Sequence, residues 1–427
     1  MIFPRHLSDT VYWDHSTVEA AVRSVWKTGS GDSYTDRLSG LIVAFLKCRS
    51  FLAFDSGRSA IGFSLRQLRK IHPDRKDVVL PWYVCTGVIE PILRNGLKPV
   101  FCGIEKDLNI SFKALKELIG PQTLAVIVPH TYGYPAQVGL CSEMVKSYSS
   151  EIFVIDDAAA GFGNKAGDKY IGTFGDIGIL SFNQAKTVVA SGGGGVLVNN
   201  NCLEAVFNEA YEEVPRLNAG EMVAQFARFL WNFRFRRYSH FINYGIYRIT
   251  GKSFSYSVSY GHRMSVIDAA MIIDQVGRFR AVHRKRSRII RQYIDYLGSV
   301  EGITIPQPKS DIYHVGRFYI SLIGEAVLWG TRGDVIRDMP LSVYLREKQI
   351  VTQYGYYPYC LLYGGSLDQR DLNYISSLIA LPVNHRIPVE QHLEVAELIK
   401  LHVVDGGKKR NGFRSFSGER RLSTGNP

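Results

Sequence analysis

The chain has 427 residues, of which 46% are hydrophobic and 21% charged, a composition that is ample for a large core and suggests two or more domains. No apolar run approaches the roughly 20 residues needed to span a bilayer, and the first residues lack the apolar region of a signal peptide. The six cysteines show neither a CxxC pair nor zinc spacing. We therefore predict a cytoplasmic protein with reduced thiols and no metal site. The formal net charge of +12 favours anionic ligands such as phosphates or nucleotides, although a solvated basic surface would give the same charge.

Short apolar runs separated by helical patterns occupy the first half of the chain. The predicted strands are residues 50–54, 77–81, 99–104, 124–129, 152–155, 177–182 and 195–198. Continuous apolar runs of this length are typical of parallel strands that are covered on both faces. Their alternation with helices predicts an α/β fold with βαβ units.

The pattern changes after about residue 200. Residues 226–250 are dense in aromatic side chains and arginines, and a long helical pattern follows over residues 265–297. Residues 291–404 mix strand and helix patterns and predict a small C-terminal domain after a large domain over residues 1–290. The last segment, 405–427, is rich in Gly, Ser and Arg, so we predict a disordered basic tail.

Residues 226–250 allow several interpretations. A basic amphipathic segment can lie on a membrane surface, which would be a peripheral contact, or against a lipid-linked substrate. A core helix or a dimer-interface helix is the favoured alternative, because aromatic stripes are ordinarily buried. We do not expect nucleic-acid binding, because no recognised motif accompanies the aromatic and basic residues.

The first candidate for a functional motif is Ser56-Gly57-Arg58-Ser59, where a predicted strand gives way to a helix. The free backbone N–H groups of a helix start, a glycine that permits a close turn and a serine hydroxyl can together hold a phosphate. The alternative is an ordinary helix cap, for which serine is a favoured residue.

The second motif, Val154 to Ala159, places Asp156 and Asp157 at the carboxyl end of a predicted buried strand. Open α/β sheets bind their ligands at this end of the strands. A carboxylate there can pair with a protonated ring nitrogen and so keep a pyridinium ring charged. A helix cap at Asp157 is the alternative.

The third motif runs from Gly178 to Lys186 and is followed by four glycines, Gly192 to Gly195. Burial beside a cationic cofactor lowers the pKa of a lysine and supplies the neutral amine that attacks an aldehyde. Glycines leave room for a cofactor and for tight backbone turns. A solvated loop lysine is the alternative, since lysines are mostly exposed.

Taken together, these motifs resemble the sugar aminotransferases of the DegT/DnrJ/EryC1/StrS family, which have the fold-type I architecture of pyridoxal-phosphate enzymes. The resemblance covers residues 26–404 in order and spacing. The segments that carry it are Ser56-Gly-Arg-Ser-Ala60, Gly96-Leu-Lys-Pro-Val-Phe101, Pro129-His-Thr-Tyr-Gly-Tyr-Pro-Ala136, Ile155-Asp-Asp-Ala-Ala-Ala-Gly-Phe-Gly163, Gly172-Thr-Phe-Gly-Asp176, Ser181-Phe-Asn-Gln-Ala-Lys186, Arg263-Met-Ser265, Leu381-Pro-Val-Asn-His385 and Glu390-Gln391.

The resemblance implies a mostly parallel seven-stranded sheet, a smaller C-terminal α+β domain and a homodimer with sites at the subunit interface. It also implies pyridoxal 5'-phosphate as cofactor, glutamate as amino donor and a nucleotide-activated keto-sugar as acceptor, in polysaccharide or glycoconjugate biosynthesis. The residue roles follow position by position. Lys186 matches the lysine that forms the Schiff base, Asp157 the partner of the ring nitrogen, Ser181 a phosphate contact, and Gly57 with Ser59 the phosphate turn.

Four positions depart from the pattern of the family. Its threonine after Gly57 is Arg58, and its glutamine three residues after the aspartate is Ala160. Its ring-stacking aromatic falls at Cys85, where Trp82 or Tyr83 on the same segment could substitute, and its phosphate-binding asparagine from the partner subunit falls at Gly261. We expect Arg58 to restore phosphate charge through a bidentate contact, and we assign Tyr83 to the cofactor site.

The departures leave two rivals to transamination open. One is another pyridoxal reaction such as sugar dehydration, although family members with that activity replace by histidine the lysine that is retained here as Lys186. The other is a non-catalytic relative that uses the fold for binding or regulation, since a fold does not determine a function. A dinucleotide-dependent oxidoreductase is disfavoured, because Gly29-Ser30-Gly31 follows no strand and has no third glycine.

Overall fold

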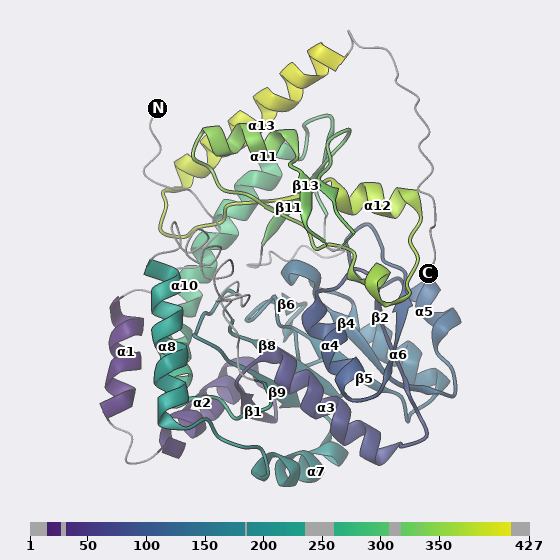
Figure 1. Cartoon of the computed structure of the whole chain (residues 1–427), viewed down its shortest axis with the longest axis vertical. Helices are drawn as coiled ribbons and strands as arrows, with labels where there is room; N and C mark the ends of the chain where they lie inside the picture. Colours follow the sequence, from purple (N-terminus) through teal and green to yellow (C-terminus); the bar gives the residue numbers. More distant parts are fainter. Residues whose placement is uncertain are drawn as a thin grey trace, which may run out of the picture.

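The computed structural model describes residues 15–26, 31–183, 186–234, 260–306, 317–331 and 333–410. A seven-stranded sheet forms its centre, in the order β1-β9-β8-β5-β4-β2-β3 (Figure 1). In that order the strands are β1 (Ser50–Phe54), β9 (Gly194–Val198), β8 (Ile177–Ser181), β5 (Phe153–Asp157), β4 (Thr123–Pro129), β2 (Asp77–Pro81) and β3 (Lys98–Cys102). All neighbouring pairs are parallel except those of β9, which is antiparallel to β1 and β8. The prediction of a mostly parallel seven-stranded sheet is confirmed.

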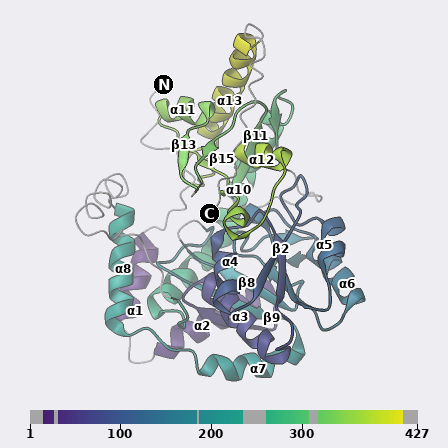
Figure 2. The same ribbon diagram turned by 45° about the vertical axis from the view of Figure 1, so that its right-hand side comes forward.

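Helices cover both faces of this sheet, which explains why its strands are apolar throughout. Along β2, Val78 and Leu80 belong to the core on one face, whereas Val79 belongs to the core on the other. The first face carries α3 (Gly57–Ile71), α4 (Thr86–Arg94) and α7 (Asn201–Glu212). The second carries α5 (Phe112–Leu118), α6 (Val138–Tyr148) and, near β1 and β9, α2 (Gly31–Leu46), with α1 (His15–Trp26) outside it (Figure 2).

Helix α10 (Val266–Leu297) connects the large sheet to a second, smaller unit. Ser265 caps its start by accepting a hydrogen bond from the Asp268 N–H. Met271 and Phe279 pack into the core of the large unit, and Tyr293 packs into the core of the small one. The boundary at residue 290 stays a prediction, and it falls where this helix passes from one core to the other.

The small unit contains a four-stranded antiparallel sheet in the order β10-β11-β15-β14. Its strands are β10 (Ile303–Thr304), β11 (Phe318–Leu322), β15 (Leu378–Leu381) and β14 (Gln353–Tyr354). Its helices are α11 (Pro340–Glu347), α12 (Gln369–Ser376) and α13 (Val389–Arg410), beside a short hairpin of β12 (Leu328–Trp329) and β13 (Val335–Arg337). Helices α11 and α13 and this sheet share one apolar core.

Two predicted segments are described only in part. Helix α8 (Ala219–Arg234) includes the beginning of residues 226–250, with Phe226 and Phe229 buried in the large core, and residues 235–259 lie outside the described part. Helix α13 extends to Arg410, within the segment predicted to be disordered, and residues 411–427 are not described. Within the described ranges, no helix combines the length and the apolar character needed to cross a membrane.

Candidate active site

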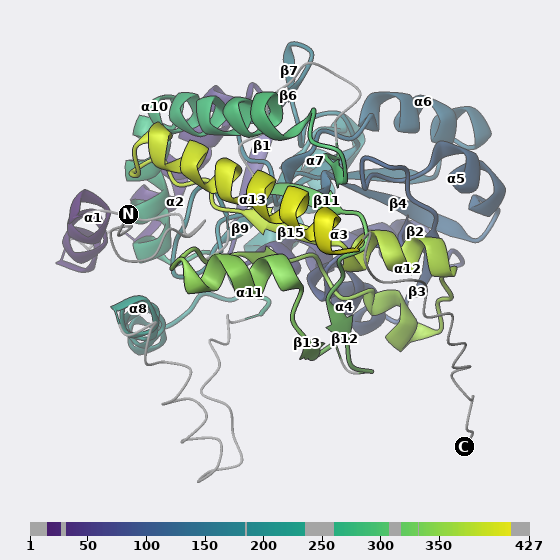
Figure 3. The same ribbon diagram turned by 90° about the horizontal axis from the view of Figure 1, so that it is seen from above.

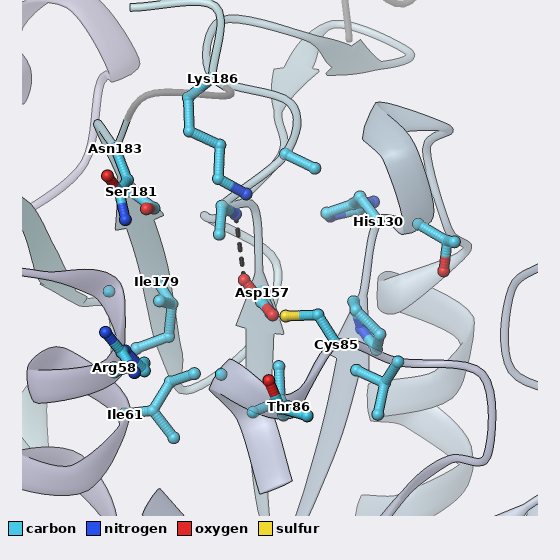
Figure 4. Close-up of a pocket in the computed structure, with 18 of the residues that line it drawn as sticks. Arg58, Ile61, Cys85, Thr86, His130, Asp157, Ile179, Ser181, Asn183 and Lys186 are labelled. Atoms are coloured by element: carbon cyan, nitrogen blue, oxygen red, sulfur yellow. Dashed lines mark hydrogen bonds between the residues drawn. The ribbon is translucent and has the colours of Figure 1, made fainter. Parts of the chain in front are cut away.

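A cavity of about 230 Å³ opens at the carboxyl ends of β4, β5 and β8, beside the starts of α3 and α4 (Figure 4). This size is slightly below the roughly 300–1,000 Å³ of most small-molecule sites. Six of the seven predicted site residues line the cavity: Gly57, Arg58, Tyr83, Asp157, Ser181 and Lys186. The structure therefore brings together residues from four separate segments of the chain. We call this cavity the Lys186 pocket.

Asp157 and Asp156 end the same strand but point to opposite faces of the sheet. Both carboxylate oxygens of Asp156 have hydrogen-bond partners within the protein. Its Oδ1 lies 2.7 Å from His130 Nε2, and its Oδ2 accepts hydrogen bonds from the N–H groups of Gly172 and Phe174, both at 2.9 Å. The Ala136 N–H donates to His130 Nδ1, so the Nε2 of this ring carries the proton and donates to Asp156.

Asp157 faces the Lys186 pocket. Its Oδ1 accepts a hydrogen bond of 3.0 Å from the Ala159 N–H, and within the described residues nothing donates to its second oxygen (Figure 4). Burial raises the pKa of Asp157, while the Ala159 N–H and the positive charge of Lys186 oppose this shift. The carboxylate is thus held in place on one side and free to bind a ligand on the other.

Lys186 lies after β8, and its side chain extends into the pocket towards Asp157 (Figure 4). Its backbone N–H donates to the Asn183 carbonyl at 3.0 Å, which ties the backbone of Lys186 to the end of β8. Within the described part of the chain, its amine makes no hydrogen bond and no ion pair. Burial lowers the pKa of Lys186, whereas Cys85 and Asp157 act in the opposite direction. The pocket therefore favours a neutral, nucleophilic amine.

The start of α3 forms the floor of the Lys186 pocket. Ser56 caps the helix by accepting a hydrogen bond from the Ser59 N–H at 3.2 Å. A Cβ atom at Gly57 would lie only 3.1 Å from the Cβ atom of Ser181, so this helix start lies directly against the end of β8. The first N–H groups of a helix together with a serine hydroxyl form a ready anion site. The geometry fits a phosphate group bound in the pocket beside Gly57 and Ser181.

The two residues that follow Gly57 make contacts that differ from the predicted ones. Arg58 reaches the pocket wall, but its guanidinium is paired with Glu90 at 3.2 Å. Ser59 does not line the pocket; its hydroxyl lies 2.8 Å from Ser56 Oγ and accepts a hydrogen bond from the Gly261 N–H at 2.9 Å. Ser59 thus connects the cap to the position where the family pattern has asparagine.

Tyr83 contributes to the wall of the pocket through a buried cluster of tyrosines. Its hydroxyl lies 2.7 Å from the hydroxyl of Tyr132, and the Tyr356 N–H donates to both, at 2.9 and 2.8 Å. Tyr356 belongs to the small unit, so the cluster joins the two units at the pocket. The role of Tyr83 in holding the cofactor stays a prediction, as does the assignment of each residue to a catalytic step.

Several residues that line the pocket were not assigned to the site from the sequence. Thr131 is only 5% exposed, and its hydroxyl has no hydrogen-bond partner within the described residues. Asn183 and Thr86 add further polar groups to the lining, and Cys85 stands beside Asp157, where burial raises the pKa of its thiol (Figure 4). An unpaired buried hydroxyl in a ligand-sized cavity is costly unless a ligand or water meets it. Together with the close turn at Gly57, this lining fits a phosphate-bearing ring.

Comparison with known families gives one match over most of the chain. The model of the DegT/DnrJ/EryC1/StrS aminotransferase family matches residues 13–399. A curated relative, GDP-perosamine synthase of Vibrio cholerae, is 29% identical over 181 residues, which are 42% of this chain and 48% of the relative. The spore coat polysaccharide biosynthesis protein SpsC of Bacillus subtilis is 25% identical over 69% of each chain. The chain spans about half the length of the first curated relatives it matches.

Solved structures show the same fold. Helicobacter pylori PseC, an aminotransferase involved in the biosynthesis of pseudoaminic acid, superimposes with a TM-score of 0.72. The match covers 94% of this chain and 100% of PseC at 17% sequence identity. At that identity the similarity establishes the architecture alone, and it agrees with the large, mostly parallel sheet and the smaller second unit.

Proposed function

The chain belongs to the DegT/DnrJ/EryC1/StrS aminotransferase family, and from this premise we propose that it uses pyridoxal phosphate to transfer an amino group from glutamate to a keto group on a nucleotide-activated sugar. One observation carries the proposal. Lys186 and Asp157 face each other across a single pocket whose floor is the capped start of α3. A transaminase needs an amine, a carboxylate and an anion site in this relation.

The residues of the Lys186 pocket can hold each part of the cofactor. The helix start at Gly57 and the Ser181 hydroxyl would bind the phosphate, and the free oxygen of Asp157 would bind the protonated ring nitrogen. When bound, pyridoxal phosphate supplies an aldehyde that condenses with amines and a ring that withdraws electrons from the adjacent carbon. Thr131 offers an additional hydroxyl in the same lining.

Lys186 then acts as the acid and base of the reaction. Burial lowers its pKa and so favours the neutral amine, and Nζ would then accept the proton from the α-carbon of the donor and return it to the carbon that had carried the cofactor aldehyde. Asp157 must stay ionised to hold the proton on the ring nitrogen. Burial opposes that state, whereas the Ala159 N–H that donates to Oδ1 and the protonated ring nitrogen that Asp157 would hold favour it.

The acceptor follows from the relatives rather than from the pocket. GDP-perosamine synthase and a spore coat polysaccharide protein are named for sugar and polysaccharide synthesis, which supports a nucleotide-linked keto-sugar as substrate in a glycan pathway. That this pathway is cytoplasmic is part of the proposal and does not rest on these names. A homodimer with shared sites belongs to the proposal as well. For residues 226–250, the buried Phe226 and Phe229 support the core-helix interpretation over peripheral membrane contact.

The visible absorption spectrum tests the proposal directly. Purified protein should absorb in the visible range with cofactor bound, and the band should shift when glutamate is added. Borohydride reduction followed by peptide mapping should place the cofactor on Lys186. Labelling of a different lysine, or a protein that stays colourless with added pyridoxal phosphate, would contradict the assignment.

The departures at Cys85 and Ala160 keep one competing function testable. Both residues line the Lys186 pocket, and neither offers the stacking ring or the amide of the family pattern. A non-catalytic relative would bind the cofactor or a sugar nucleotide without consuming glutamate. Glutamate-dependent spectral change, measured with and without candidate keto-sugars, distinguishes turnover from binding alone.

A further inference from the structure

A second and larger cavity is lined by residues of α2, α10 and the hairpin of β6 (Lys165–Ala166) and β7 (Lys169–Tyr170), and Lys186 is not among its lining residues. Figure 3 shows α10 and this hairpin from above. The volume of the cavity is about 760 Å³, well within the range of small-molecule sites. The two cavities are neighbours along the chain. Ala160 lines the Lys186 pocket, and Gly163, three residues later, lines this cavity. Phe162, which lies between these residues in the sequence, is buried. We call this cavity the arginine groove.

Its rim is a row of like charges along α10. Arg280, Arg284 and Arg288 are exposed and follow one another at intervals of four residues, which places them on one face about 6 Å apart along the axis. None of the three has an ion pair or a hydrogen bond within the described residues, and no carboxylate lines the groove. Like charges at this spacing destabilise a helix, and a bound anion would remove the repulsion.

The floor of the groove is aromatic. Phe45 lies against Tyr170 with ring centroids 5.4 Å apart and meets Phe279 edge to face at 5.5 Å. Lys165 places its Nζ 4.7 Å from the centroid of the Tyr170 ring, at the edge of the same floor. Phe45 and Tyr170 are partly exposed, so they offer flat apolar surface next to the cationic row. Flat rings bind such surfaces by stacking.

We propose that the arginine groove binds a nucleotide, with its phosphates on Arg284 and Arg288 and its base against the aromatic floor. The combination of several unpaired guanidinium groups with an adjacent aromatic surface fits a ligand that carries both phosphates and a flat ring. The charges line a bounded cavity rather than a flat face, which favours a small ligand over a membrane surface or a nucleic-acid strand. The site goes beyond the proposed transamination and does not depend on it.

Titration calorimetry with UDP and with inorganic pyrophosphate tests this site on the full-length protein. Because the substrate site of the proposed transaminase would also take UDP, the titration counts UDP sites per chain. We expect one of these sites to be the groove, and the R284E/R288E variant to lose that site or at least about tenfold of its affinity, because each guanidinium–phosphate contact is charge-assisted. The matched control is K113E/K116E, which makes the same change in net charge on the exposed side of α5. If R284E/R288E left the number of UDP sites and their affinities unchanged, or if K113E/K116E caused an equal loss, the proposal would be overturned.

The aromatic floor has its own test. The Tyr170→Ala variant should weaken UDP several-fold and leave pyrophosphate unchanged, because only UDP carries a ring. Equal binding of UDP and pyrophosphate to the unaltered protein would refute a nucleotide site. Two further results would do the same: binding to vesicles with anionic lipid but not to UDP at about 1 mM, and a change of oligomeric mass in R284E/R288E, which would make the groove a contact between subunits.

Discussion

In the Lys186 pocket, a partly buried lysine and a buried carboxylate face each other, whereas in the arginine groove three guanidinium groups are exposed to solvent. The pocket holds one amine and one carboxylate with space for a ligand between them, so both groups can act on the same bound molecule. The groove accumulates charge that the fold does not neutralise. We therefore expect different effects when a charge is removed. In the pocket the reaction rate should fall, whereas in the groove ligand affinity and helix stability should change.

Replacement of the pocket amine should give the largest effect. Lys186→Ala removes both the covalent anchor and the proton carrier, so we expect the rate to fall by roughly 10⁴-fold or more. Stability should not fall, because the amine makes no hydrogen bond within the described residues and its burial disfavours the charge. Transaminase assays and thermal unfolding measure the two quantities. Lys186→Arg is the control that keeps a charge without a usable amine, and it should be equally inactive.

The adjacent aspartates make a matched pair. Asp157→Asn should reduce the rate by roughly 10²- to 10⁴-fold, since the proton on the ring nitrogen is no longer held. Asp156→Asn should instead cost about 2–3 kcal/mol of unfolding free energy, because three buried donors point at this carboxylate. Rates and denaturant unfolding of both variants provide the comparison. If Asp156→Asn were the less active and Asp157→Asn the less stable, the assignment of the two faces would be wrong.

The pH dependence of the unfolding free energy provides a further test of the role of Asp157. The folded state raises the pKa of Asp157, so in the cofactor-free protein the contribution of this carboxyl to stability is fully present below the usual pKa of an aspartate and is lost as pH rises through the raised value. Asp157→Asn should therefore stabilise the cofactor-free protein at neutral pH and leave it unchanged in acid. Unfolding free energies of both proteins across this range test the sign. Equal stability at all pH values would show that burial does not act on this carboxyl.

These contrasts show what the sequence could and could not predict. Each predicted strand of the large sheet agrees with the structure within two residues at either end, because buried parallel strands are continuous apolar runs. Lys186 and Asp157 were found because each follows such a run. Contacts between distant segments were not foreseeable: Arg58 pairs with Glu90, and Tyr356 donates to Tyr83 and Tyr132.

The same limit explains the two features that only the structure revealed. In the sequence Thr131 is one residue of a longer motif. That its hydroxyl is buried without a hydrogen-bond partner within the described residues depends on the packing of distant segments around it. The arginine groove joins residues 45, 163–170 and 279–291, and only the first of these lies near a predicted strand. The sequence displayed the basic residues of the long helix, yet it gave no indication that an aromatic floor would lie beside them.

A smaller effect is expected at the floor of the Lys186 pocket. Gly57→Ala would bring a methyl group within 3.1 Å of the Ser181 Cβ atom, so the helix start must move away from β8 at a cost of about 1–3 kcal/mol. The same movement should weaken the binding of pyridoxal phosphate and of inorganic phosphate. Cofactor titration by absorbance and thermal unfolding measure the two effects. Gly120→Ala is the control, because a Cβ atom there meets nothing within 4 Å.

The smallest effect separates the groove from ordinary surface charge. Arg284→Gln removes one member of the row on α10, so we expect the ligand-free protein to gain about 0.2–0.5 kcal/mol of unfolding free energy. Arg278→Gln on the same helix should lose a similar amount, because Arg278 is paired with Asp274 at 2.8 Å. High salt should reduce both differences, since the charges are screened. A loss of stability in Arg284→Gln would mean that this guanidinium already has a partner, and the groove would then lack the unneutralised charge from which its ligand is inferred.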